Sequence, residues 1–511
     1  MDTAKSHSYK SLFERFMSMA SEDNSGAFWK NRITTTGVIL SGLVGVAGVV
    51  LLIVEAIQPR EGLTLGVIVY LVWPGVLAGC VALAGLGLLW GWWRLRRQGI
   101  KPRLPAIDLH DHHVFRRLVI LAIGLVFSTF FATIFSYRMY HFTESSEFCG
   151  LACHKVMRAE YVAYKNSPHS NVGCAQCHIG PGAEWYVKAK LSGLHQVYVV
   201  AFDTYKPPIK APVEELRPAR ETCNACHRPD KFFGAVLRTW TSYMSDKKNS
   251  PWTIKMLMHI GGGNPNHGAV RGIHWHMEGV NTIEYVASDP KRLDIPWVRV
   301  TDQNGKVNIY QAKDPAKRLT SEKLAGATKR TMDCMDCHNR PTHWYLTPDK
   351  AMDLALQAGR LDDTLPDIKA TGVKLLSATY TTTPEALLAV ADGLKKKYAG
   401  DPRLDSTVTE VQHILKNNIF PEQKARWDEY PDHIGHRTTP GCFRCHDGKH
   451  VDDSGKSISK DCRTCHTILA QGPGKDVKGM SSEGLEFQHP EDIGDSWKEE
   501  LCNSCHGESS K

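Results

Sequence analysis

The N-terminal part of the chain contains three long runs of apolar residues. They occupy about residues 33–56, 63–93 and 115–137. Each run is long enough to cross a hydrocarbon core ~30 Å thick, which takes about 20 helical residues. The second run is longer than needed and contains Pro74, so we expect a kink or a strong tilt in it. The pattern predicts a membrane anchor of three transmembrane helices.

After Tyr137 the pattern changes to short stretches in which apolar and polar residues alternate. The segments IPWVRV and KVNIYQ flank TDQNG, in which Asn304 followed by Gly305 is a strong hairpin signal. A second pair of such segments flanks SDKKNSP, so we expect a small β insertion over residues 234–311. Further on, Thr383 followed by Pro384 is typical of a helix start, and Gly400 of a helix end.

Cysteines change this picture, because 12 of the 15 occur in Cys-x-x-Cys-His motifs. The six motifs are Cys174, Cys177 and His178; Cys223, Cys226 and His227; Cys334, Cys337 and His338; Cys442, Cys445 and His446; Cys462, Cys465 and His466; and Cys502, Cys505 and His506. In a c-type haem site, both cysteines tether the porphyrin and the histidine binds iron. One such motif is also typical of a zinc site or a redox dithiol, but six copies favour haem.

A further pair of cysteines is separated by one residue too many. In FCGLACHKVM, Cys149 and Cys153 have three residues between them, and His154 follows. We interpret this stretch as an altered haem site, which brings the expected cofactors to seven covalently bound haem c groups. The remaining Cys80 lies in an apolar run, where we expect it to pack as a small hydrophobe.

The expected fold class is three transmembrane α-helices plus an exported multihaem cytochrome c domain, with the small β insertion. We expect short helices and loops wrapped around the haems. The expected segments are a cytoplasmic N-terminal segment (1–32), the membrane anchor (33–137), haems one to three (138–233), the β insertion (234–311), haem four with a helical region (312–430) and haems five to seven (431–511).

The distribution of charge predicts the orientation in the membrane. Residues 94–117 contain seven lysines and arginines, whereas 57–62 contain only Arg60, beside Glu61. Cytoplasmic loops are enriched in basic residues, so we expect a cytoplasmic N-terminus and, after Tyr137, a haem domain in the periplasm of a bacterial inner membrane. Residues 1–137 hold 13 basic and 8 acidic residues, which is +5 of the total +8. A basic excess at that place indicates contact with the lipid bilayer and no nucleic-acid partner.

Spare histidines are numerous enough to complete most irons. Of the 24 histidines, four precede the haem region and seven follow cysteine pairs, which leaves 13. This surplus favours low-potential, bis-histidine haems that transfer electrons. The candidate distal ligands without an assigned haem are His195, His259, His267, His274, His276, His413, His433, His436, His450 and His489.

A membrane anchor followed by haem motifs and the segment NSPHSNVGCAQCH resembles the NapC/NirT/NrfH family of quinol dehydrogenases. The similarity covers about residues 149–343, interrupted by the β insertion. Three transmembrane segments with seven haem motifs are most similar to the heptahaem inner-membrane cytochromes of metal-reducing bacteria. The resemblance implies a membrane quinol (menaquinol or ubiquinol) as substrate and a soluble periplasmic c-type cytochrome as acceptor.

The resemblance also implies iron ligands. His169 precedes His178 by nine residues and His343 follows His338 by five, as the distal ligands of the family do. The family arrangement implies crossed ligation, in which His343 completes the haem of His178 and His169 that of His338. At the first haem the family has a methionine ligand, and Met157 lies close to that position. Either Met157 or His154 would bind this iron, and methionine would raise its potential.

A possible quinol site follows the second motif. In GAEWYVKAKLSGLHQVY, the side chains of Lys188, Lys190 and His195 lie where the family has residues near the quinol. On a helix, Lys188 and His195 would share one face. They would accept quinol protons or bind its hydroxyls, or else form a basic face against lipid phosphates.

The expected function is therefore quinol oxidation at the periplasmic face, with electrons passed along the haems to periplasmic cytochromes and onward to extracellular metal. Two alternatives remain open at this point. One is a non-catalytic electron wire fed by a partner membrane subunit. The other is a periplasmic reductase of an oxyanion such as nitrite, which would require an iron with an open coordination position.

Overall fold

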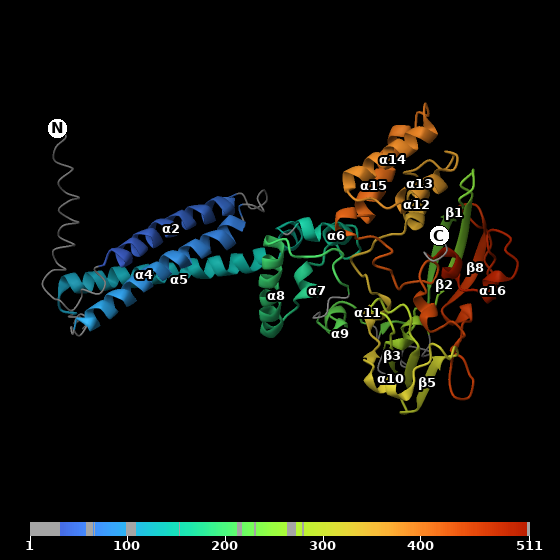
Figure 1. Ribbon diagram of the computed structural model, residues 1–511, viewed down its shortest axis with the longest axis horizontal. Helices are drawn as coiled ribbons and strands as arrows, with labels where there is room; N and C mark the ends of the chain where they lie inside the picture. Colours follow the sequence, from blue (N-terminus) through green and yellow to red (C-terminus); the bar gives the residue numbers. More distant parts are fainter. Residues whose placement is uncertain are drawn as a thin grey trace. The chain divides into compact units, whose positions relative to one another are not determined.

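The computed structural model describes residues 31–57, 65, 67–98, 109–152, 154–211, 217–228, 231–262, 272–277 and 281–507. The chain divides into two compact units, Met1–Ala152 and Cys153–Lys511. Figure 1 shows long helices in the first unit and a mixture of helices and small sheets in the second.

Three helices of the first unit are long and apolar enough to cross a membrane. They are α2 (Arg32–Ile57), the π-helical turn η2 (Ile68–Val72) continued by α4 (Trp73–Arg97), and α5 (His112–Thr143). The three predicted membrane helices are thus confirmed. The irregularity expected at Pro74 takes the form of the π-helical turn directly before it. Small residues let α2 and α4 approach closely, since a Cβ added at Gly37 would lie 2.5 Å from the Ala84 nitrogen.

Two small antiparallel sheets belong to the second unit. One contains β1 (Val236–Tyr243), β2 (Pro251–Met258) and β8 (His466–Pro473) in that order. The other has the order β6 (Arg330–Thr331), β3 (Thr282–Val286), β4 (Trp297–Thr301), β5 (Val307–Ala312) and β7 (His450–Val451). The expected hairpin of β4 with β5 is confirmed, and Gly305 has the positive φ of +77° that its turn requires; β1 and β2, which flank SDKKNSP, also pair with each other. The sheets nevertheless extend beyond residues 234–311, because β6, β7 and β8 come from later in the chain.

Four helices form an apolar core of their own in the second unit. They are α12 (Pro348–Gln357), α13 (Ile368–Ser377), α14 (Thr383–Tyr398) and α15 (Leu404–Asn418). The helix start predicted at Thr383 is confirmed: Thr382 and Glu385 form a capping box around it. Met352, Leu394 and Leu415 are fully buried, so this region holds together by ordinary side-chain packing.

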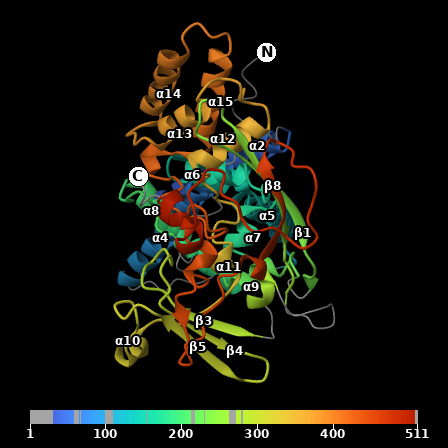
Figure 2. The ribbon, with the colours of Figure 1, turned by 90° about the vertical axis from the view of Figure 1, so that its right-hand side faces the viewer.

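The remaining helices are short. They are α6 (His154–Lys165), α8 (Ala183–Ala201), α10 (Ser321–Gly326), α16 (Ser496–Glu499), the 3₁₀ turns η6 (Ile273–His276) and η7 (Pro421–Gln423), the π-helical turn η3 (Phe148–Ala152), and six turns that carry cysteine motifs. In Figures 1 and 2, the motif helices α7 (Cys174–His178), α9 (Ala219–Cys223) and α11 (Cys334–Cys337) lie between the α12–α15 helices and the sheet of β3, β4 and β5.

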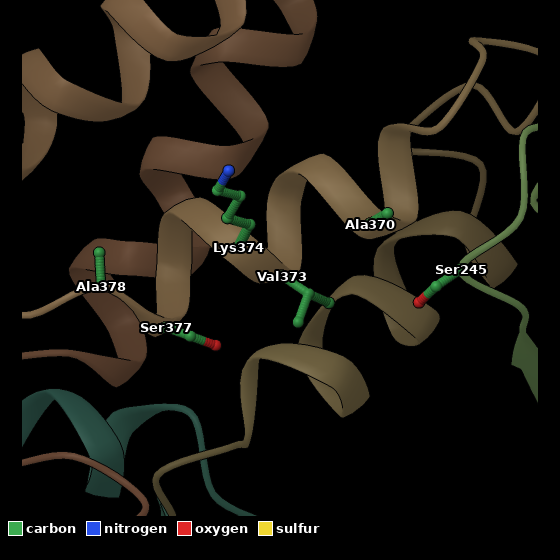
Figure 3. A pocket seen from close by; sticks show the side chains of 6 residues that line it. All are labelled: Ser245, Ala370, Val373, Lys374, Ser377 and Ala378. Atoms are coloured by element: carbon green, nitrogen blue, oxygen red, sulfur yellow. The ribbon is translucent and has the colours of Figure 1, made fainter. Parts of the chain in front are cut away.

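A surface hollow of about 410 Å³ lies on α13 (Figure 3). Its lining consists of Ser245, Ala370, Val373, Lys374, Ser377 and Ala378. None of these side chains is a haem or metal ligand, so we place the functional site elsewhere.

Candidate haem sites

Each regular cysteine motif includes part or all of one short helical turn; α9 ends at Cys223, and hydrogen bonds from the Cys226 and His227 amides to the Cys223 carbonyl continue the turn through the third motif. The turns are α7 (Cys174–His178), α9 (Ala219–Cys223), α11 (Cys334–Cys337), η8 (Gly441–Arg444), η9 (Cys462–Thr464) and α17 (Cys502–His506). Side chains three and four residues apart share one face of such a turn, so both cysteines and the histidine can meet one flat group. Side-chain caps support two of the turns, with Asp333 at the start of α11 and Asp461 at the start of η9.

The fourth motif is anchored by a buried carboxylate that the sequence analysis did not single out. Asp336 is 1% exposed and accepts hydrogen bonds from Tyr285 Oη (2.6 Å), Arg292 Nη1 (2.8 Å) and Arg330 Nε (2.7 Å). Burial and the nearby charge of Asp336 raise the pKa of Tyr285, so its hydroxyl stays a donor. This network ties α11 to the sheet that contains β3. Its position inside the motif CMDCH was the only sequence signal for it.

Every regular motif histidine faces one histidine from another part of the chain. The distances between ring centres are 6.3 Å for His178 and His343, 6.1 Å for His227 and His169, 6.4 Å for His338 and His274, 5.8 Å for His446 and His276, 6.3 Å for His466 and His436, and 6.0 Å for His506 and His489. We call these the six histidine pairs. Each pair combines one motif histidine with one spare histidine.

The spacing of the six histidine pairs matches a shared metal. With a metal–nitrogen bond of about 2 Å on each side and roughly 1.1 Å from each nitrogen to its ring centre, two imidazoles that sandwich one metal have centres about 6 Å apart. Two aromatic rings in direct contact have centres ~4.5–7 Å apart, so the neutral state of the rings and their free ring nitrogens, and not the spacing alone, favour a shared metal. Burial lowers the pKa of His178 and His276, and it lowers that of His343 and His466 to about 4. These rings are therefore neutral and keep a lone pair for a metal.

Hydrogen bonds fix which ring nitrogen faces inward. In four of the spare histidines Nδ1 donates to a backbone carbonyl: His169 to Pro341 (3.1 Å), His343 to Glu160 (3.1 Å), His274 to Ile260 (2.8 Å) and His276 to Ile273 (2.8 Å). The motif histidine His446 does the same to Ser459 (2.8 Å). A carbonyl only accepts, so Nδ1 carries the proton and Nε2 is left as the ligand atom. The residues present thus fit six bis-histidine haems.

The arrangement of two pairs differs from the crossed ligation expected from the sequence. His343 faces His178 as expected, but His169 faces His227 and not His338. The partner of His338 is His274, from the turn η6. The Pro341 carbonyl, just after the fourth motif, binds Nδ1 of His169. The opposite edge of the His169 ring therefore faces His227 of the third motif.

Two other candidate ligands have both ring nitrogens engaged by protein groups. His433 has Nδ1 3.2 Å from the Asp336 carbonyl and Nε2 3.0 Å from the Lys291 carbonyl. His450 has Nδ1 2.9 Å from Asp447 Oδ1 and Nε2 2.6 Å from the Ile295 carbonyl. Although burial opposes it, the hydrogen bond to Asp447 raises the pKa of His450, which holds this ring as a cation. Neither ring has a nitrogen left for iron.

The other candidates lie outside the six histidine pairs. His413 is exposed on α15 and hydrogen-bonds Asn417, and His259 has Nε2 3.0 Å from Thr467 Oγ1. His195 is exposed on α8, and His267 lies outside the described residues.

Successive motifs adjoin one another in sequence order. Cys223 of the third motif is hydrogen-bonded to Cys334 of the fourth. Burial raises the pKa of one cysteine in each of four motifs, and a thiol of an adjacent motif raises it further. Cys226 acts in this way on Cys177, Cys442 on both Cys337 and Cys465, and Cys462 on Cys502. The turn η6 also joins the fourth and fifth sites, because it supplies both His274 and His276. The second to seventh sites therefore form one continuous series.

Comparisons with known proteins agree with this chemistry. Residues 111–219 match the profile of the NapC/NirT cytochrome c family, N-terminal region. The chain is 40% identical over 503 residues to the cytochrome c-type protein ImcH of Geobacter sulfurreducens, which covers 96% of this chain and 97% of that protein. The chain belongs to the NapC/NirT cytochrome c family. No solved structure matches it. As an ImcH-like c-type cytochrome of this family, it binds haem c covalently.

The first, lengthened motif is described only in part. Cys149 lies in the π-helical turn η3, which directly follows the end of α5 in the chain. Cys153 and the side chain of His154 lie outside the described residues. Met157 is half-buried on α6, one turn after His154. The choice between Met157 and His154 as the first iron ligand stays a prediction.

The candidate quinol residues are all on α8. An apolar stripe at helical spacing, formed by Val187, Leu191, Leu194 and Tyr198, is between 54% and 67% exposed. Lys188 Nζ donates to Glu184 (2.8 Å), and Lys190 lies over the Tyr186 ring at 5.0 Å. An apolar stripe next to basic residues is typical of a helix that lies at the interface of a bilayer.

Proposed function

We propose that this protein oxidises a quinol, menaquinol or ubiquinol, at the periplasmic face of the inner membrane and passes the electrons to a soluble periplasmic cytochrome, as part of respiration on extracellular metal. The six histidine pairs carry this proposal. They would supply two ring nitrogens to each of six haem irons, and successive sites adjoin one another, as electron transfer along the chain requires.

The chain's residues hold the cofactors in defined ways. When bound, each haem would take up and release one electron at its iron. The cysteines of each motif would tether one haem, and the six histidine pairs would provide its axial nitrogens. The backbone carbonyls that accept from Nδ1 keep each spare histidine in one tautomer and orientation. At the first site, Cys149, Cys153 and either His154 or Met157 would do the same.

Quinol oxidation releases two electrons and two protons, and α8 offers groups for the protons. His195 would accept a proton from the quinol, and Lys190 would hydrogen-bond a quinol oxygen. Lys188 is ion-paired with Glu184, so we assign it the role of orienting the helix against lipid phosphates. The exposed apolar stripe of α8 would let a lipid-soluble quinol approach these groups.

The two rival functions are less well supported. An oxyanion reductase requires an open iron, but each of the six regular motif histidines faces a second histidine, so these sites offer no open position. A wire fed by a partner membrane subunit would need no exposed apolar stripe beside basic residues on α8.

The test is reduction of the purified, oxidised protein in detergent by a menaquinol analogue. We expect the haem absorption bands to show full reduction, and a quinol-site inhibitor to prevent it. If dithionite reduces every haem but the analogue reduces none, the protein is a wire and the proposal of quinol oxidation is wrong.

A further inference from the structure

The seventh motif ends the series of haem sites. The first motif directly follows α5 along the chain, and the second to seventh sites adjoin one another in sequence order. The seventh site adjoins the sixth, since Cys502 interacts with Cys462 of the sixth motif. An electron that enters at the first site therefore has its longest path to the pair His506 and His489.

The segment that supplies His489 is acidic, whereas the whole chain is basic. Residues 483–500 contain seven acidic side chains and one basic one, a net charge of −6 on a chain whose total is +8. The side chains of 491–496 and 498–500 are exposed. The one basic residue, Lys498, is already paired with Asp495 (3.0 Å) and lies 3.4 Å from Glu486. The segment thus presents a surplus of carboxylates to solvent.

The same segment is built around the terminal histidine pair. His489 Nδ1 lies 2.8 Å from the Glu491 carbonyl oxygen and 3.2 Å from the Glu491 amide nitrogen, and Phe487 has its ring 6.4 Å from His489 and 5.5 Å from Trp497. Trp497 belongs to α16, labelled in Figure 1. The carboxylates are therefore attached to the residues that position the last iron ligand, which distinguishes them from an acidic loop elsewhere on the surface.

We propose that residues 483–500, together with the seventh motif, form the electron-exit surface, where a soluble one-electron acceptor with a lysine-rich rim around its redox centre docks. This rests on the proposed transfer of electrons along the six histidine pairs. In each encounter the acceptor gains one electron, the seventh site loses one, and no bond or proton is exchanged. Opposite charge accelerates such encounters and orients the partner, and the low affinity of rim contacts permits rapid release.

Binding is tested with a probe that cannot react in the dark, a lysine-rich cytochrome c whose iron is replaced by zinc. Quenching of its fluorescence by the full-length protein gives Kd at low and at physiological salt. We expect binding that weakens steeply with salt. The double variant Asp492→Lys with Glu499→Lys should raise Kd about tenfold or more at low salt and flatten the salt dependence.

The matched control, Asp392→Lys with Asp405→Lys, replaces two exposed carboxylates on α14 and α15 by lysines. It changes the net charge by the same amount as Asp492→Lys with Glu499→Lys. We expect its Kd to stay within about twofold of the unmodified protein. Carbodiimide cross-linking of the probe should give linked peptides from residues 483–500. Equal affinity of the two double variants, or cross-links confined to other segments, would overturn the proposal.

The outcome is separable from that of the proposed function. Reduction of the haems by the menaquinol analogue should be unchanged in Asp492→Lys with Glu499→Lys, because neither residue lies on α8. If the analogue fails to reduce even the unmodified protein, quinol oxidation is wrong, while the binding measurements still decide where an acceptor docks.

Discussion

At the scale of single residues, the state of both ring nitrogens decides which histidines serve an iron. His274 has Nδ1 bound to a carbonyl and its ring facing His338, whereas His433 has both nitrogens within reach of carbonyls. We expect His274→Ala to leave one iron with a single axial histidine and to convert one low-spin haem to high spin. Electron paramagnetic resonance and the absorption spectrum measure this change.

His433→Ala is the matched control, since it removes a buried histidine near the same motif. It should leave all haems low-spin, although it destabilises the fold by about 1–3 kcal/mol because Arg444 and two carbonyls lose a partner. A spectrum that changes equally in both variants would mean that His433 is a ligand and that the pairing with His274 has been misassigned.

Met157 is one of the two candidate ligands of the first iron, beside His154. Replacing it by histidine should lower the potential of one haem and slow reduction by the menaquinol analogue, because methionine ligation raises a haem potential relative to bis-histidine. Dithionite should still reduce all haems. Redox titration followed by absorption measures the shift, and an unaltered titration curve would show that Met157 only packs in this region.

At the scale of elements, α8 is a helix of the second unit that exposes a stripe of apolar side chains. Leu194→Asp places a charge in the apolar stripe, where we expect it to oppose contact with the bilayer edge and to raise KM for the quinol analogue by about tenfold, a cost of ~1.4 kcal/mol. Leu388→Asp is the control, because Leu388 on α14 is 65% exposed and Leu194 67%. Steady-state rates over a range of quinol concentrations give KM for both. Equal effects would remove α8 from the quinol site.

Elements with a local signal were predictable from the sequence. The membrane helices follow from long apolar runs, and the β4–β5 hairpin follows from Asn304 and Gly305 between alternating segments. The β8 strand was not predicted, since it lies directly after the sixth motif and pairs with β2 about 210 residues earlier in the chain. The apolar core of α12, α13 and α15 was not predicted, although these helices have ordinary apolar periodicity.

The pairing of histidines could not be predicted either, for a physical reason. Motif spacing fixes which histidine follows which cysteines, but a distal ligand is chosen by three-dimensional proximity. His274 and His338 are 64 residues apart, and His169 and His227 are 58 apart. The sequence contains enough spare histidines to give most irons a second ligand, and the family spacing indicates His169 and His343 as two of these ligands. Only the fold shows which motif each of them faces.

At the scale of the whole molecule, we expect the basic residues between the second and third apolar helices to set the orientation in the membrane. Alkaline phosphatase, which is active only in the periplasm, should be active when fused after Tyr137 and inactive when fused near Gly99. The difference of seven basic residues against one in the two loops carries this expectation. Activity at Gly99 and none at Tyr137 would place the haem motifs in the cytoplasm, where haem c is not attached.

The whole chain also makes a prediction about the number of haems and of free thiols. If all seven motifs bind haem, 14 of the 15 cysteines form thioethers, and Cys80 alone keeps its thiol. The pyridine haemochrome assay should give seven haems per chain, and thiol titration of the denatured protein should give one thiol. Cys80→Ser should abolish that thiol and leave the haem count unchanged. Six haems with three thiols would mean that the extra residue in FCGLACHKVM prevents attachment, and that electrons enter the series at the second site.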